Sequence, residues 1–150
     1  MTTTDRPREW GWVIRPSTGA WQEFIHTTDK LLSENIRHGA LDAAGAPKRD
    51  AADQTLGTLA RLERLLVEAA RVDPEAREVM SPLRFVRNER QTPAHHLAVP
   101  TTDAQTAARQ RDLLSQLGDS LESVRVLLSR HPKASGWRVP EALKLKLYRL

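Results

Sequence analysis

Apolar residues recur at helical spacing along the first long segment of the chain, which follows Pro16. Ser17 or Thr18 can cap a helix there, and Gly39 is a stop signal, so we expect this helix to end near His38. Steps of three and four residues place its core-facing side chains on one side. That side is formed by Trp21, Phe24, Ile25, Thr28, Leu31, Leu32 and Ile36.

A second amphipathic segment follows a connector expected at residues 39–50, where glycine and proline disfavour a helix. The helix is expected to begin near Asp50 or Asp53 and to end near Val72, because the acidic residues can act as caps. Its apolar stripe is formed by Leu56, Leu59, Leu62, Leu66 and Ala69.

A third helix is predicted over residues 74–91. Asp73 can cap it, Pro74 suits the first helical position, and Glu75 places an acid in the first turn. Pro82 lies inside this helix and should kink or divide it, because proline lacks the backbone N–H. The core positions are Val79, Met80, Leu83 and Val86.

The longest apolar stripe predicts a helix from Asp103 to about Arg130, ended by Pro132. The leucines near the C-terminus alternate as in a strand and also step as in a helix, and we favour a short terminal helix. The stripe is formed by Leu113, Leu114, Leu117, Leu121, Val124, Leu127 and Leu128.

Amphipathic helices joined by short connectors cannot bury their stripes singly, so they should pack together. We therefore predict an all-α, four-to-five-helix bundle forming a single domain over residues 1–150. Residues 1–16 are expected to form an N-terminal arm, residues 17–131 the bundle, and residues 132–150 a tail packed on the bundle.

Composition narrows the functional classes. The chain has 150 residues, no cysteine and 39% apolar residues, and no run is long enough to cross a bilayer. The segment after Met1 lacks an apolar core of the kind found in signal peptides, so a cytoplasmic location is expected. The net charge of +4 comes mainly from arginine, whose forked guanidinium suits phosphate, which makes RNA or DNA a candidate partner.

The candidate chemistry is concentrated in residues 84–96, where Pro93 must end the third helix. Guanidinium groups can neutralise a phosphodiester while an imidazole moves a proton near neutral pH. On RNA such groups need no metal, because the adjacent 2′-hydroxyl can attack the phosphorus. The candidate side chains are Arg87, Asn88, Arg90, Gln91, His95 and His96.

The stretch from Arg90 to His95 resembles the Arg-x4-His motif of HEPN domains, which are helical bundles. The longer string from Arg87 to His95, Arg-x2-Arg-Gln-x-Pro-Ala-His, looks like a variant found in uncharacterised HEPN-like proteins. Residues 28–36 and the His131-Pro132 pair also fit that resemblance. HEPN nucleases commonly carry Asn, Asp or His directly after the motif arginine, whereas this chain carries Gln91, which keeps an amide group.

The resemblance implies an HEPN-like bundle that acts as a metal-independent endoribonuclease in a toxin or anti-phage defence system. Arg90 would stabilise the scissile phosphate and His95 would act as the acid or base. One such pair per chain is a sparse active site, so a homodimer that faces two pairs across a two-fold axis is expected. The supporting or RNA-binding residues would be Arg87, Asn88, Gln91 and His96.

Other interpretations of these residues stay open. Arg90 and His95 can instead satisfy the free carbonyls at the end of the third helix. Many HEPN-like domains are non-catalytic, so a helical protein-interaction module, such as an antitoxin or adaptor with a cognate partner protein, is the alternative function. A basic DNA-binding regulator is a weaker candidate, because the chain shows no convincing helix-turn-helix sequence.

No metal or other cofactor is expected. The adjacent side chains of His95 and His96 diverge, and no carboxylate stands beside them at ligand spacing. Trp10, Trp12 and Trp21 fit either base stacking or anchoring of the arm to the bundle, and we favour anchoring.

Overall fold

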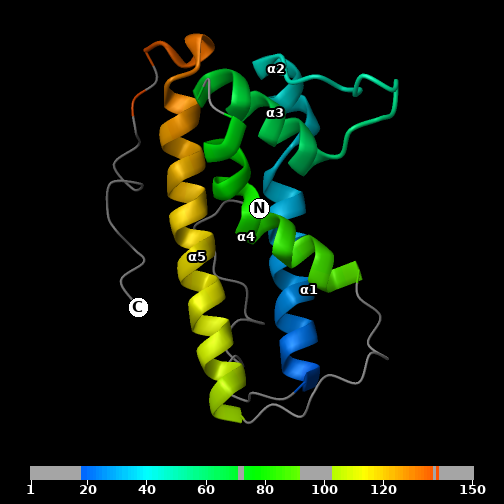
Figure 1. Cartoon of the computed structure of the whole chain (residues 1–150), viewed down its shortest axis with the longest axis vertical. Coiled ribbons are helices and arrows are strands. Elements are labelled where there is room, and N and C mark those ends of the chain that lie inside the picture. The colour runs from blue at the N-terminus through cyan, green and yellow to red at the C-terminus, as the bar shows by residue number, and fades with distance from the viewer. Residues whose placement is uncertain (1–17, 71–72, 92–102, 137, 139–150) are drawn as a thin grey trace.

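The structure confirms an all-α bundle. The computed structural model describes residues 18–70, 73–91, 103–136 and 138 (Figure 1). Within these ranges there is no strand, and the only β pairing is an isolated bridge between Arg49 and Thr55. The helices are α1 (Thr18–Asn35), α2 (His38–Ala44), α3 (Thr58–Ala70), α4 (Asp73–Gln91), α5 (Asp103–Ser129) and a short 3₁₀ turn, η2 (Pro132–Ala134).

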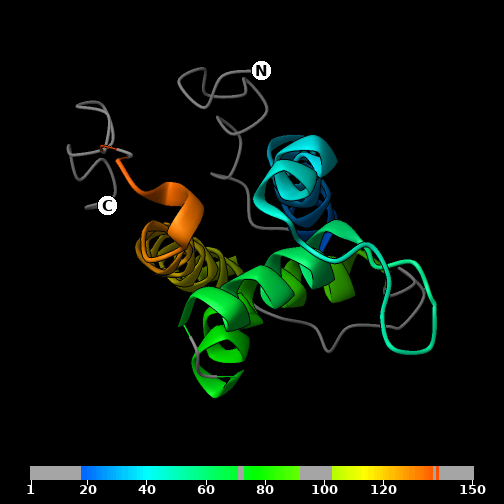
Figure 2. The same ribbon diagram turned by 90° about the horizontal axis from the view of Figure 1, so that it is seen from above.

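Helix α4 occupies the middle of the bundle. It packs against α1, α3 and α5, while the short α2 packs against α3. Figure 2, seen from above, shows α1 and α5 nearly end-on with α4 passing across both. The C-terminal end of α4, which carries the candidate residues, extends past α1 on the side away from α5 (Figures 1 and 2).

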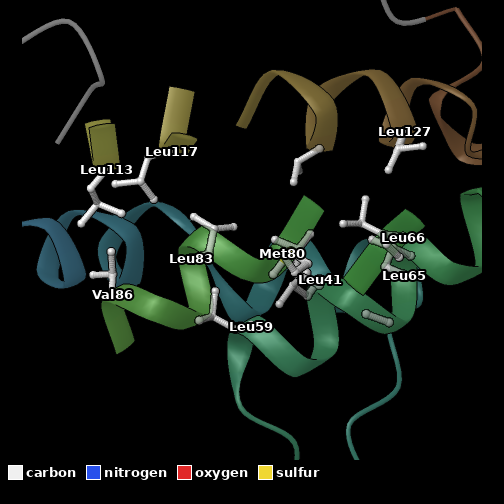
Figure 3. Packing of buried hydrophobic residues seen from close by; sticks show 14 of the residues in the cluster. Leu41, Leu59, Leu65, Leu66, Met80, Leu83, Val86, Leu113, Leu117 and Leu127 are labelled. Atoms are coloured by element: carbon white, nitrogen blue, oxygen red, sulfur yellow. The ribbon is translucent and has the colours of Figure 1, made fainter. Parts of the chain in front are cut away.

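The core is aliphatic, as the composition predicts. Most of its residues lie on α1, α3, α4 and α5, and Leu41 of α2 and Ala46 complete it. The leucines Leu113, Leu117 and Leu127 of α5 point toward the leucines of α3 and α4 (Figure 3). Leu121 departs from the predicted stripe of α5, because its side chain is exposed. The largest fully buried apolar side chains are Phe24, Ile25, Leu66, Met80, Leu83 and Val86.

The prediction for the end of the first helix was wrong. Helix α1 ends at Asn35, Arg37 is extended, and α2 begins at His38 with Gly39 inside it. Leu41 is buried and anchors α2 to the core. The stop signal is instead Gly45, whose φ of +92° lies in the left-handed region and whose N–H bonds to the carbonyl of Asp42.

The predicted start of the second helix was also wrong, because α3 begins only at Thr58. The carboxylate of Asp50 accepts hydrogen bonds from the N–H groups of Ala52 and Gln54, both at 2.9 Å. Asp53 takes a positive φ of 60° and pairs with Arg49 at 2.8 Å. These aspartates therefore form a side-chain-stabilised turn instead of a helix cap.

Helices α4 and α5 match their predicted ranges closely. Helix α4 continues through Pro82, and its ribbon changes direction partway along its length (Figure 1), as expected when proline removes one backbone hydrogen bond. No helix in the described ranges is long and apolar enough to cross a membrane. The predicted N-terminal arm and most of the predicted C-terminal tail lie outside the described residues.

Candidate functional site

The predicted site residues divide into two groups. Arg87, Asn88, Arg90 and Gln91 lie in the last turns of α4. His95 and His96 fall outside the described residues, so the geometry described below is that of the α4 side of the site. In these last turns Arg87 and Arg90 contact α1, and Glu89 also contacts α5.

Asp29 of α1 binds both motif arginines. Its Oδ1 accepts a hydrogen bond from Nε of Arg87 at 2.7 Å, and its Oδ2 accepts one from Nη1 of Arg90. Arg87 also donates from Nη2 to the hydroxyl of Ser33 at 3.0 Å. The two arginines are one helical turn apart and bind the same carboxylate of a neighbouring helix.

Burial of the Asp29 carboxylate explains why it orients both arginines. The side chain of Asp29 is only 2% exposed, and a buried carboxylate requires a cationic partner because desolvation of an unpaired charge is costly. Charge-assisted hydrogen bonds of this kind are short and directional. Asp29 therefore fixes the orientation of both guanidinium groups at the end of α4.

Arg90 stays accessible in spite of this pairing. Its side chain is 46% exposed, and one donor of its guanidinium is engaged by Asp29. A guanidinium carries five N–H donors in a planar fork. Arg90 thus combines a fixed orientation with donors that can reach a ligand on the solvent side.

Glu89 links the end of α4 to both α1 and α5. Its Oε2 accepts hydrogen bonds from Nε1 of Trp21 and from Nη2 of Arg109, each at 3.1 Å. The guanidinium of Arg109 lies 4.1 Å from the centre of the Trp21 ring, a cation–π geometry. Trp21 is buried in the core, so its ring is not exposed for base stacking.

Asn88 and Gln91 are exposed on the outward-facing side of α4. Gln91 follows Arg87 by four residues and is therefore its neighbour on the helix surface, whereas Asn88 follows Arg84 by four residues.

Sequence reasoning missed Asp29. A signal was present, because Asp29 continues the steps of four residues that connect Trp21 and Ile25 and so falls on the apolar side of α1. An acid at a core position implies a cation opposite, but the sequence alone does not say which of the many arginines provides it.

The described residues contain no cluster of three or more histidine or carboxylate side chains able to hold a metal ion. No protein-family model matches the chain, and neither a curated protein nor a solved structure matches it.

Proposed function

We propose that this chain is an HEPN-like, metal-independent endoribonuclease that cleaves RNA by attack of the 2′-hydroxyl on the adjacent phosphorus. The observation that carries the proposal is the pairing of Arg90 with Asp29. A buried carboxylate holds an accessible guanidinium in the last turn of α4, five residues before His95. Preorganised donors of this kind are effective at stabilising charge that develops in a transition state.

The proposed reaction moves two protons, one from the attacking 2′-oxygen and one to the leaving 5′-oxygen. The 2′-oxygen loses its proton to an imidazole and bonds to phosphorus, while the bond from phosphorus to the 5′-oxygen breaks and that oxygen gains a proton. Arg90 binds the phosphate oxygens, and His95 acts as the base or the acid. The products are a 2′,3′-cyclic phosphate and a 5′-hydroxyl end.

The remaining candidate residues support this pair. Arg87 shares the Asp29 carboxylate with Arg90, while Asn88, Gln91 and His96 contribute hydrogen bonds to the RNA. With one catalytic histidine and one arginine per chain, one of the two proton transfers has no acid or base to carry it out. We therefore propose a homodimer in which His95 of the second copy completes the site.

The test uses single-stranded RNA and the purified full chain with a metal chelator present. The proposal expects cleavage with cyclic phosphate ends, and loss of that cleavage in His95→Ala. Arg111→Ala is the matched control, because Arg111 is an exposed arginine of α5 and is not one of the proposed site residues. Cleavage that persists in His95→Ala, or that disappears on removal of metal, would overturn the mechanism.

A second candidate function is a non-catalytic protein-interaction module, such as an antitoxin or adaptor. The observation in its favour is that Asp29 also accounts for Arg87 and Arg90 as a purely structural link between α1 and α4. Leu121 and Val126 of α5 are exposed apolar residues that a partner can cover. This function predicts a stable complex with a cognate protein and no RNA turnover.

A further inference from the structure

A groove with a volume of about 450 Å³ lies between α4 and α5. Phe85 is its lining residue from α4, and the other wall follows α5 at steps of three and four residues. That wall includes Ala108, Arg109, Asp112, Leu113 and Gln116. A volume of this size is in the range of sites for small molecules, so the groove can hold a group much larger than a water molecule.

Phe85 gives the groove an accessible aromatic ring. The residue is 37% exposed, and within the described ranges the only other exposed large apolar residues are Leu121 and Val126, which are not aromatic. An exposed ring in a concave site provides a face on which a planar group can stack.

Arg109 is held in place beside this ring. Its guanidinium carbon lies 4.1 Å from the centre of the Trp21 ring and 5.7 Å from the centre of the Phe85 ring. Its Nη2 donates to Oε2 of Glu89 at 3.1 Å. Because Glu89 balances its charge, Arg109 contributes an oriented planar group to the groove and not an unpaired cation.

The charges around the groove favour a neutral ligand with hydrogen-bond donors. Asp112 is exposed, and in the part of the chain that the structure describes its carboxylate pairs with no cation. An anion would meet this carboxylate, and a cation would meet the guanidinium of Arg109. An ionised carboxylate only accepts hydrogen bonds, so the ligand must offer N–H or O–H groups. A nucleobase is flat and neutral and carries such donors at its edge.

We propose that this groove binds one base of the RNA strand, with Phe85 stacking on its face and the carboxylate of Asp112 accepting hydrogen bonds from its edge. The inference rests on the proposed nuclease function and adds a base that the protein reads. Guanine fits best, because its N1–H and its 2-amino group are adjacent donors that one carboxylate can accept together.

The groove lies near the proposed catalytic arginine. Phe85 precedes Arg90 by five residues of α4, which corresponds to about 7.5 Å along the helix and roughly 140° around it. Glu89, which binds Arg109, comes directly before Arg90. A base in the groove is therefore close in the strand to the phosphate at Arg90, and cleavage should occur at a fixed distance from a guanine.

The experiment measures binding of the full chain to an RNA of about 12 nucleotides, in which one guanosine stands among uridines and 2′-O-methyl groups prevent cleavage. A matched RNA carries inosine in place of guanosine, which keeps the ring system and lacks the 2-amino group. The test variant is Asp112→Asn. The control is Asp119→Asn, which removes the same charge from an exposed position of α5 outside the groove. Circular dichroism checks that each variant keeps its helices.

We expect the wild-type chain and Asp119→Asn to bind the guanosine RNA about tenfold more tightly than the inosine RNA, because inosine lacks one hydrogen bond to a charged group. In Asp112→Asn the two affinities should differ by at most about threefold. A guanosine preference that is absent from the wild type, or that is undiminished in Asp112→Asn, would overturn the site.

Phe85→Leu tests the stacking surface, and Phe85→Tyr is its control because tyrosine keeps the ring. Phe85→Leu should weaken binding of both RNAs about tenfold, whereas Phe85→Tyr should bind them as the wild type does. Equal affinities of the leucine and tyrosine variants would contradict stacking on this residue.

Further outcomes separate this site from the proposed function. A guanosine preference that depends on Asp112 in a chain that cleaves no RNA supports the base site and counts against the nuclease. Cleavage by a wild-type chain that binds both RNAs equally supports the nuclease and overturns the base site. Sedimentation tests a second copy as the occupant. If Phe85→Leu dissociates a dimer and leaves RNA binding unchanged, the groove is a self-association surface and the base site is overturned.

Discussion

Asp29 on α1 and Arg90 on α4 are 61 residues apart in the chain and form an ion pair through Oδ2 and Nη1. The carboxylate is buried and the guanidinium is about half exposed. Because Arg87 binds the other carboxylate oxygen, this contact both joins two helices and orients the arginine nearest to the predicted catalytic histidine. The proposed function and the packing of α1 against α4 would therefore depend on the same residue, Asp29.

The first prediction concerns Asp29→Asn. The amide has nearly the same shape but no charge, and its NH₂ group cannot accept from a guanidinium, so one of the two arginines loses its partner. We expect the free energy of unfolding to fall by about 1–3 kcal/mol, less than for a fully buried pair because both arginines are partly exposed. Urea denaturation measures the change.

The matched control for this variant is Glu34→Gln, which removes an exposed carboxylate of the same helix, 4.0 Å from Lys30. Exposed pairs of this kind contribute little, so the free energy of unfolding should change by less than about 0.5 kcal/mol. Similar effects of the two substitutions would show that Asp29 has no special role in holding α1 to α4.

A second prediction concerns Arg61 of α3, whose side chain is 3% exposed. Its guanidinium donates to the carbonyls of Pro47 and Ala46, to Nδ1 of His38 and to the carboxylate of Asp42. Arg61→Ala should lower the free energy of unfolding by about 2–4 kcal/mol, because it removes a buried side chain and takes the donor from the buried carbonyl of Ala46 and from three partly buried acceptors.

Arg61→Lys tests the same arrangement, since one ammonium group cannot reach all four acceptors and should recover little of the lost stability. The control is Arg64→Ala, one turn along α3, where the side chain is exposed and the expected change stays within about 0.5 kcal/mol. Full recovery by lysine would contradict the role of the forked guanidinium.

Stability should also depend on pH through Asp42. The hydrogen bond from Arg61, followed by that from Lys48, lowers the pKa of the Asp42 carboxyl below its ordinary value of 3.8. A lowered pKa contributes stability that is present above the ordinary value and is lost as the pH falls through the lowered one. Acid titrations of the wild type and Asp42→Asn should therefore diverge at neutral pH and converge below the lowered pKa. A constant difference across that range would contradict the assignment.

The buried amide of Gln110 provides a prediction of the opposite sign. This α5 side chain is 1% exposed, and in the described part of the chain neither its Oε1 nor its Nε2 has a hydrogen-bond partner. Gln110→Leu keeps a similar volume and removes the unpaired polar groups, so it should raise the free energy of unfolding by about 1 kcal/mol. Gln116→Leu, on the exposed face of α5, should leave it nearly unchanged. A loss of stability in Gln110→Leu would indicate that the amide has a binding partner.

Hydrophobic periodicity was sufficient to predict α4, α5 and the helical class, because long stripes with Asp caps and prolines at their ends leave few alternatives. It was insufficient for α2, whose seven residues bury only Leu41 among them. It also failed at Asp50, since an aspartate that caps a helix and one that closes a turn have the same local sequence signature.

The candidate site could be predicted only in its local part. Arg87, Asn88, Arg90 and Gln91 share one helix, so the sequence places them together without reference to the fold. Asp29 reaches Arg90 only through packing of α1 against α4. Contacts of this kind depend on which helix faces pack against each other, and a single sequence does not specify that.

The central claim is that Arg90, and not Arg87, binds the scissile phosphate, and the rate of RNA cleavage by Arg90→Lys and Arg87→Lys tests it most directly. Each lysine can keep an ion pair with Asp29 but loses the planar fork. We expect Arg90→Lys to cleave about 100-fold more slowly than the wild type, and Arg87→Lys to lose at most about tenfold. Equal rates for Arg90→Lys and the wild type, a larger loss in Arg87→Lys, or a wild-type chain that cleaves no RNA would contradict the account.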